Sequence, residues 1–125
     1  MHDNKTFLEL EAWKSCRDLR MTIWNFCKTL PSTEKFRLAD QMIRASRSAT
    51  ANIAEGYGRY NYQENIQYCR MSRGSLQEIR DHLTAALDCE YISTEEYQNI
   101  DSLTTTCLKL INGYINYLIR QKKTQ

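Results

Sequence analysis

Glycine and proline are scarce in this 125-residue chain, which contains four glycines and a single proline. Tight turns depend on these two residues for their special φ values, and an all-β domain of this length needs many such turns. The scarcity therefore excludes a sandwich or barrel of short strands. It favours a few long helices instead.

Long apolar runs are also lacking. No uninterrupted stretch of about 18 apolar residues occurs, so we expect no membrane-spanning helix. Met1 leads into polar and acidic sequence instead of an apolar signal core, which argues against secretion. Apolar residues make up 42% of the chain and charged residues 26%, which are the shares of a globular protein and not of a disordered one. We expect a cytoplasmic protein in which residues 1–125 form one domain.

The sequence offers no recognisable metal site or disulfide framework. Its cysteine count is odd, no two cysteines stand in CxxC spacing, and only His2 and His82 could assist a metal. We therefore predict no bound metal. Reduced cysteines that serve as small core residues are the expected state of Cys16, Cys27, Cys69, Cys89 and Cys107.

Apolar residues recur at helical spacing in four segments, at about 8–29, 38–55, 61–89 and 93–121. Pro31 ends the first segment, and Gly56 and Gly58 are expected to end the second in the left-handed conformation. Asn61 and Ser93 are predicted N-caps of the last two segments, because each precedes a glutamate by three residues. Long helices with short connections predict an all-α, antiparallel up-down-up-down four-helix bundle.

Two of the predicted helices have more apolar surface than a lone bundle can bury. On a helical wheel, the apolar residues of the last segment cover roughly 200°, whereas an outer helix needs little more than about 100°. Trp13 and Trp24 lie off the centre of the first apolar stripe, where they either overlap the core edge or serve an interface. We expect homo-oligomerisation through Trp13, Trp24, Leu108, Leu110, Ile115 and Tyr117.

A polar strip follows the apolar stripe of the second segment, formed by Gln41, Arg44, Ser48, Asn52 and Glu55. Glycine in the middle of a helix is unfavourable, so Gly74 is expected to permit close approach of a neighbouring helix near Glu78. The favoured interpretation is a structural network in which Arg44 meets Glu55 or Glu78. A catalytic carboxylate pair is the alternative, but no nucleophile, metal-ligand set or histidine base converges with it. We therefore predict no enzyme activity, no cofactor and no small-molecule substrate.

Charge is distributed unevenly, although the formal net charge is only +2. Residues 81–108 carry six acidic groups and no lysine or arginine, whereas residues 109–125 carry four basic groups and no acid. Every basic residue from Arg37 to Arg80 is arginine, whose rigid fork suits phosphates and carboxylates. We expect RNA or DNA binding through an arginine-rich face consisting of Arg44, Arg47, Arg59, Arg70, Arg73 and Arg80. A merely solvated charged face is the alternative, since a dedicated binder is usually more basic.

The second segment also carries a specific motif, Gln41-x-x-Arg44-Ala45-x-x-Ser48-x-x-x-Asn52-Ile53-Ala54-Glu55-Gly56-x-Gly58-Arg59. It resembles the hallmark of the 23S rRNA intervening-sequence protein family, which is also known as a four-helix-bundle protein family. Further similar patterns are Leu10-Glu11-Ala12-Trp13-Lys14, Leu30-Pro31-x-x-Glu34 and Gly74-Ser75-x-x-Glu78, so the resemblance covers about residues 8–120. The chain departs from the family at Ala39, where a threonine or serine cap is usual, and at Ser72-Arg73, where a small apolar pair is usual.

The resemblance implies an antiparallel four-helix bundle that assembles into a ring-like homo-oligomer, with a pentamer as the expected form. It implies no catalytic residue, and some relatives in this family resemble basic barrels that engage nucleic acid. We therefore expect a non-enzymatic oligomeric bundle that binds RNA or DNA. The alternative is a protein-interaction scaffold or adaptor with no nucleic-acid role.

Overall fold

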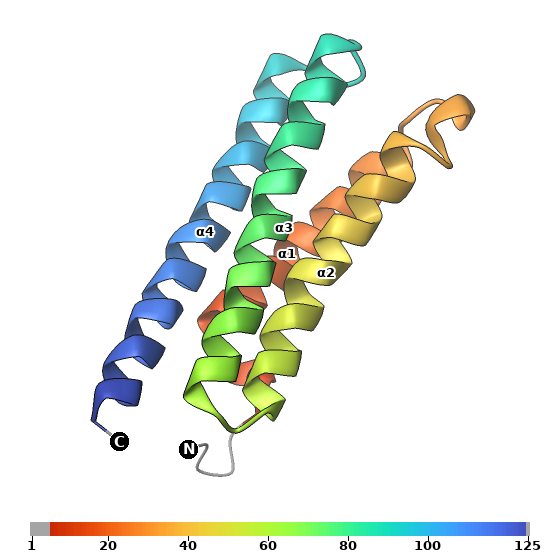
Figure 1. The fold of residues 1–125 in the computed structure, drawn as a ribbon. Helices are drawn as coiled ribbons and strands as arrows, with labels where there is room; N and C mark the ends of the chain where they lie inside the picture. The colour runs from red at the N-terminus through yellow and green to blue at the C-terminus, as the bar shows by residue number, and fades with distance from the viewer. Residues whose placement is uncertain (1–5, 125) are drawn as a thin grey trace.

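A computed structural model describes residues 6–124, which form four long helices (Figure 1). These are α1 (Glu11–Cys27), α2 (Leu38–Gly58), α3 (Tyr62–Asp88) and α4 (Thr94–Lys123), with short 3-10 turns η1 (Phe7–Glu9) and η2 (Ser32–Glu34). Each helix packs against its neighbours in the order α1–α2–α3–α4–α1. The direction of the chain reverses at each connection (Figure 1), which confirms the predicted antiparallel all-α bundle.

The core lies between the helices, where their apolar stripes meet. Its largest fully buried apolar side chains are Leu19, Ile23, Met42, Ile53, Ile66, Leu76, Ile79, Leu83, Ile111 and Leu118. Four of the five cysteines are buried as well, Cys89 is exposed, and all five are free thiols. Within each helix these residues follow the 3.6-residue periodicity of the apolar stripes.

The predicted N-caps of the last two helices are confirmed. The Asn61 side chain accepts a hydrogen bond from the Glu64 backbone N–H at 2.9 Å, and Ser93 Oγ accepts one from the Glu96 N–H at 3.1 Å. These bonds satisfy amide groups that the first helical turn leaves without partners. The far end of α4 reaches Lys123, two residues beyond the predicted end at 121.

α2 ends at Gly58, as predicted, but Gly56 lies within the helix and neither glycine takes the expected left-handed conformation, since neither has a positive φ. The chain instead reverses at Tyr60, which takes the left-handed conformation with φ of 52°. Gly56 has a different role. A Cβ atom at this position would lie 2.7 Å from Asn65 Oδ1 and 2.9 Å from Tyr68 Cβ, so its hydrogen lets α2 and α3 approach closely.

The close approach predicted for Gly74 is not observed. A Cβ atom built on Gly74 would meet no heavy atom within 4 Å, and the residue is exposed. The conformational cost of glycine in mid-helix is therefore not offset by a packing contact at this position.

The first helix begins later than predicted because Leu10 is extended, with ψ of 127°. The preceding turn η1 places the Phe7 ring edge-on against Trp13, with the ring centroids 5.3 Å apart. Arg17 and Arg20 lie over the same indole, and Trp13 is buried. Phe7, just before the predicted start of the helix at about residue 8, thus covers one of its tryptophans.

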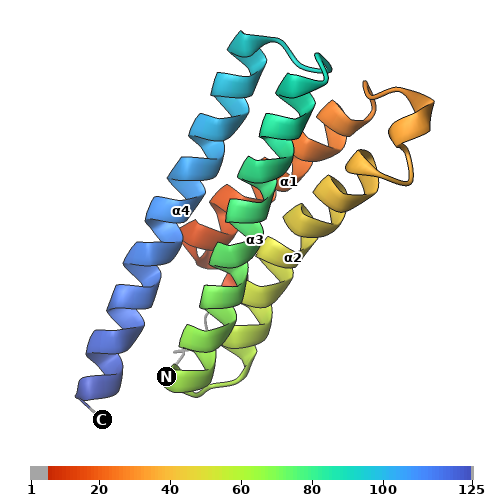
Figure 2. The same ribbon diagram turned by 45° about the horizontal axis from the view of Figure 1, so that its top comes forward.

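The hairpins α1–α2 and α3–α4 diverge toward the end that carries their connections at 28–37 and 89–93 (Figures 1 and 2). A hydrogen bond links the two connections, because Tyr91 Oη donates to Glu34 Oε2 at 2.9 Å. This bond to a carboxylate raises the pKa of Tyr91 above its ordinary value. No helix within residues 6–124 is sufficiently long and apolar to cross a membrane.

Candidate nucleic-acid interface

Three of the six arginines predicted to bind nucleic acid form salt bridges within the chain. Arg44 Nε lies 3.3 Å from Asp40 Oδ2, and an Arg59 nitrogen lies 3.2 Å from Glu55 Oε1. Arg80 Nε lies 2.9 Å from Asp101 Oδ1. A phosphate group would have to compete with a carboxylate for each of these guanidinium groups.

Arg59 and Arg80 are held by further interactions. Arg59 donates to Tyr68 Oη at 2.7 Å and lies over the Tyr68 ring, and Tyr68 and Glu55 together raise the pKa of Arg59. The hydrogen bond to Asp101 is the largest cause of a raised pKa at Arg80. Both pKa shifts mean that the charged form of each guanidinium is stabilised by its partners within the chain.

The other three arginines have no carboxylate partner among the described residues. Arg47 lies over the Trp24 ring, 5.8 Å from its centroid, on the α1–α2 side of the bundle. Arg73 donates to the neutral Asn112 side chain at 3.0 Å. Arg70 makes no salt bridge within residues 6–124 and lines a hollow between α3 and α4.

This hollow has a volume of about 380 Å³ and is strongly basic. Its lining consists of Gln63, Ile66, Arg70, Ile119, Lys122 and Lys123. Lys122 Nζ donates a hydrogen bond to Gln63 Oε1, so its nearest partner is a neutral amide. Among residues 6–124, no carboxylate lines the hollow, so its three positive charges repel one another.

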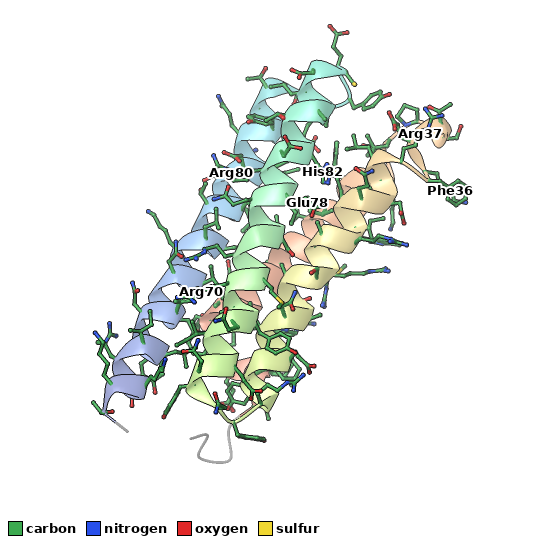
Figure 3. The ribbon with its side chains drawn as sticks, in the orientation of Figure 1. Phe36, Arg37, Arg70, Glu78, Arg80 and His82 are labelled. Atoms are coloured by element: carbon green, nitrogen blue, oxygen red, sulfur yellow. The ribbon has the colours of Figure 1, made fainter. Side chains whose placement is uncertain are left out.

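The side chains are brought together by helix periodicity on two antiparallel neighbours. Gln63, Ile66, Arg70 and Arg73 follow one another at intervals of three or four residues along α3, and therefore share one face. Arg70 and Arg80 both lie on the α4 side of α3 (Figure 3). We call Arg70, Arg73, Lys122 and Lys123 the basic seam.

Lys122 and Lys123 were missed by the sequence-based prediction, which ended the last helix at 121. The structure continues α4 through both lysines, where their charges are favourable at the negative end of the helix dipole. The sequence feature that could have indicated these two lysines is the charge distribution, since residues 109–125 hold four basic groups and no acidic residue.

The predicted network of Arg44 with Glu55 or Glu78 is wrong. Glu78 instead lies 3.0 Å from His82 Nε2 on the same helix, and Figure 3 shows this pair apart from Arg70. Gln41, Arg44 and Glu55 are exposed. Arg44, Glu55 and Glu78 therefore each pair with a residue one helical turn away instead of with one another across the bundle.

The α2–α3 contact contains smaller polar side chains from the motif. Ser75 Oγ donates to Ser48 Oγ at 3.0 Å, and Asn52 Nδ2 donates to the Ser48 carbonyl at 2.9 Å. Ser72, one of the departures from the family pattern, is buried and donates to the Ala49 carbonyl at 2.7 Å. These bonds give Ser48 and Asn52 a structural role.

A buried polar centre also joins α3 to α4. The fully buried Asn65 donates from Nδ2 to Tyr114 Oη at 3.1 Å, and its Oδ1 accepts a hydrogen bond from the Cys69 thiol at 3.5 Å. Burial is the main reason why the pKa of Tyr114 is raised. Among the described residues no buried side-chain nitrogen or oxygen lacks a partner.

Half of the predicted oligomer interface lies in the core of the protein's own bundle, so the prediction is wrong for Trp13, Leu108 and Ile115. Phe7 covers Trp13, and α4 contacts both α1 and α3, which buries a wider arc than one neighbour would. Trp24, Leu110 and Tyr117 are 40%, 36% and 45% exposed. Leu110 lies on α4 facing α1, whereas Trp24 lies on α1 facing α2.

Metal-ligating side chains do not gather within residues 6–124: no group of three or more histidines, cysteines, aspartates or glutamates is placed to hold an ion. His2, one of the two histidines considered from the sequence, lies outside the described residues.

The architecture is that of an antiparallel four-helix bundle with a basic seam between its last two helices. Residues 8–113 match the 23S rRNA-intervening sequence protein family, and the chain belongs to this family. A protein of unknown function from Bacteroides thetaiotaomicron, assigned to the S23 ribosomal protein family, has a similar crystal structure. It is 24% identical with a TM-score of 0.78, over 84% of this chain and 95% of its own. Comparison with curated proteins gives no significant match.

Proposed function

We propose that this protein is a non-enzymatic, cytoplasmic, oligomeric bundle that binds RNA or DNA through the basic seam. The observation that carries the proposal is the convergence of Arg70, Lys122 and Lys123 on one hollow without a carboxylate. Phosphate groups supply the regularly spaced negative charge that such a surface attracts. The family description, which refers to an intervening sequence of 23S rRNA, also favours an RNA partner.

The seam is suited to the nucleic-acid backbone. Arginine forks bind phosphate oxygens in a bidentate manner, whereas lysines act as point charges. Such contacts position a nucleic acid without reading its sequence. We therefore expect weak sequence preference and strong salt dependence. Arg44, Arg59 and Arg80 would contribute less, because their carboxylate partners would have to be displaced.

Fluorescence anisotropy with a labelled RNA hairpin, and with a DNA hairpin of the same sequence, tests this proposal. Counterion release predicts the tightest binding at about 50 mM salt, with affinity falling steeply towards about 200 mM. Absence of binding to both hairpins at about 50 mM salt would contradict the nucleic-acid role.

The oligomeric part of the proposal is supported by exposed apolar side chains on α4. Leu110 lines a hollow of about 290 Å³ together with Leu10 and Tyr114, and the exposed Tyr117 ring stacks on Tyr114. Exposed aromatic and aliphatic groups of this kind mark protein contacts. Light scattering should give about five times the chain mass of 14.8 kDa. A monomer at micromolar concentration would contradict assembly.

A scaffold or adaptor without a nucleic-acid role is the second candidate function, and the exposed side chains of Trp24 and Tyr117 favour it. The same anisotropy experiment separates the two candidates. For either, an enzymatic role has little support, because Glu55 and Glu78 each pair with a basic residue on their own helix and none of the described pockets contains either carboxylate.

A further inference from the structure

The outer seam between α1 and α2 contains a groove that the proposed nucleic-acid role does not use. Two hollows of about 320 and 210 Å³ share Trp24 and Ile43, so they form one continuous depression. One hollow extends to Arg20 and Met21, and the other reaches the α1–α2 connection. We call this depression the α1–α2 groove.

Apolar side chains form much of the groove. Met21 and Trp24 are half-exposed within it, and Leu30, Pro31 and Ile43 extend the apolar lining. Beyond its end, Phe36 projects from the bundle (Figure 3) and is 83% exposed. Solvent-exposed aromatic side chains beside a concave apolar surface are typical of sites that hold a partner's side chains.

The charged residues of the groove all have the same sign. Arg20, Lys28, Lys35 and Arg47 line it, and no aspartate or glutamate does. None of the four makes a salt bridge to a described carboxylate, and Arg20 donates only to the Thr50 hydroxyl, at 3.0 Å. Glu34, next to Lys35 in sequence, accepts the bond from Tyr91, and Asp40 pairs with Arg44. The groove therefore lacks negative charge.

The arrangement around Trp24 favours a protein over a nucleic acid. Lys28 Nζ and the Arg47 guanidinium already lie over its ring, 5.3 and 5.8 Å from the centroid. A nucleobase would have to displace a cation in order to stack on this indole. Aliphatic neighbours such as Leu30 and Ile43 are instead suited to a leucine or phenylalanine side chain.

We propose that the α1–α2 groove binds an acidic amphipathic helix of a partner protein, whose apolar side chains insert beside Trp24 and whose carboxylates pair with Lys28, Lys35 and Arg47. The α1 positions from Arg20 to Lys28 span about 12 Å, which matches roughly two turns of a bound helix. The site is separate from the basic seam, which lies between α3 and α4.

A synthetic peptide tests the proposal directly. The probe is an amphipathic peptide of about 15 residues with leucines at i, i+3, i+4 and i+7 and glutamates on the other face. Nuclear magnetic resonance titration of the ¹⁵N-labelled protein should move the Trp24 indole N–H and the α1–α2 amides, with a Kd below about 100 μM. The same peptide with lysines in place of glutamates should bind at least about tenfold more weakly.

Matched variants identify the surface. Lys28→Glu with Arg47→Glu should weaken binding of the acidic peptide by at least about tenfold, and Trp24→Ala should do the same. Lys14→Glu with Arg44→Glu makes an equal charge change on the same two helices outside the groove, and should leave binding unchanged. Met71→Ala, at an exposed apolar position on α3, is the corresponding apolar control on another face.

Three results would overturn the proposal. The first is an acidic peptide that fails to perturb the groove at about 1 mM. The second is a groove charge reversal that abolishes hairpin RNA binding while leaving peptide binding intact, which would assign the groove to nucleic acid. The third is a reversal that lowers the mass of the assembly, which would assign the groove to a second copy of this chain.

Discussion

Gly56 and Gly74 both lie inside helices, yet their surroundings differ in a way that sequence position does not reveal. A methyl group on Gly56 would meet Asn65 Oδ1 and Tyr68 Cβ at less than 3.0 Å, and α3 would have to move. A methyl group on Gly74 would lie in open space. The same substitution should therefore have opposite effects at the two positions.

We expect Gly56→Ala to lower the free energy of unfolding by about 1–3 kcal/mol, because forced overlap outweighs the better helix propensity of alanine. Gly74→Ala should raise it by about 0.5–1 kcal/mol. Urea denaturation followed by circular dichroism measures both. Equal or greater stability of the Gly56 variant would contradict the close α2–α3 approach.

The buried thiols predict a loss of stability in alkali. Burial raises the pKa of Cys69 from 9.0 to about 12 and that of Cys27 to about 11. Between the unfolded and folded pKa values only the unfolded chain releases these protons. The stability that these protonated thiols contribute is therefore fully present below pH 9.0 and is lost as the pH rises towards about 12.

Cys69→Ala removes one of these titrating groups, so its free energy of unfolding should fall less steeply between about pH 8.5 and pH 10.5 than that of the wild type. Cys89→Ala is the matched control, because this thiol is exposed. Urea titrations across this range give the slopes. Identical slopes for the wild type and the Cys69 variant would show that the buried thiol does not set the alkaline limit.

Individual helices were predictable where their signals are local. The N-caps Asn61 and Ser93 act within four residues of themselves, and the apolar stripes follow from helix geometry. Errors arose where the backbone takes a conformation that the residue preferences do not indicate. Phe7 covers Trp13 only because Leu10 breaks the helix, and the turn at Tyr60 uses a left-handed conformation at a residue that rarely adopts it.

The cap of α3 gives a prediction at the scale of one element. Asn61→Ala should lower the free energy of unfolding by about 1 kcal/mol, because the Glu64 amide loses its acceptor. Asn99→Ala, at an exposed position inside α4, should change it by less than about 0.5 kcal/mol. Thermal and urea unfolding measure the difference. An unchanged free energy of unfolding in the Asn61→Ala variant would mean that water replaces the cap without loss of stability.

Across the whole molecule, the candidate site depends on which positive charges remain without a partner. Helix periodicity places Arg70, Arg73 and Arg80 on one side of α3. It could not show that Arg80 meets Asp101 whereas Arg73 meets the neutral Asn112, because both partners come from α4. Pairing across the bundle thus shifts the candidate interface towards the end where Lys122 and Lys123 lie.

The oligomeric prediction changed for a related reason. A wide apolar arc on α4 would leave surface exposed for an interface if only one helix of the bundle packed against it. However, α4 contacts both α1 and α3. Leu108 and Ile115 are therefore core residues, and a smaller surface around Leu110 and Tyr117 is left for assembly.

The most direct test of the basic seam compares two triple variants of equal charge. One replaces Arg70, Lys122 and Lys123 with glutamine, and the other replaces the salt-bridged Arg44, Arg59 and Arg80 with glutamine. The measurement is the dependence of hairpin RNA affinity on salt. We predict that the seam variant binds more weakly and that the slope of log K against log salt becomes shallower by about 2 to 3, whereas the salt-bridged variant keeps most of the wild-type slope. Equal slopes for the two variants, or a greater loss in the salt-bridged variant, would contradict the account.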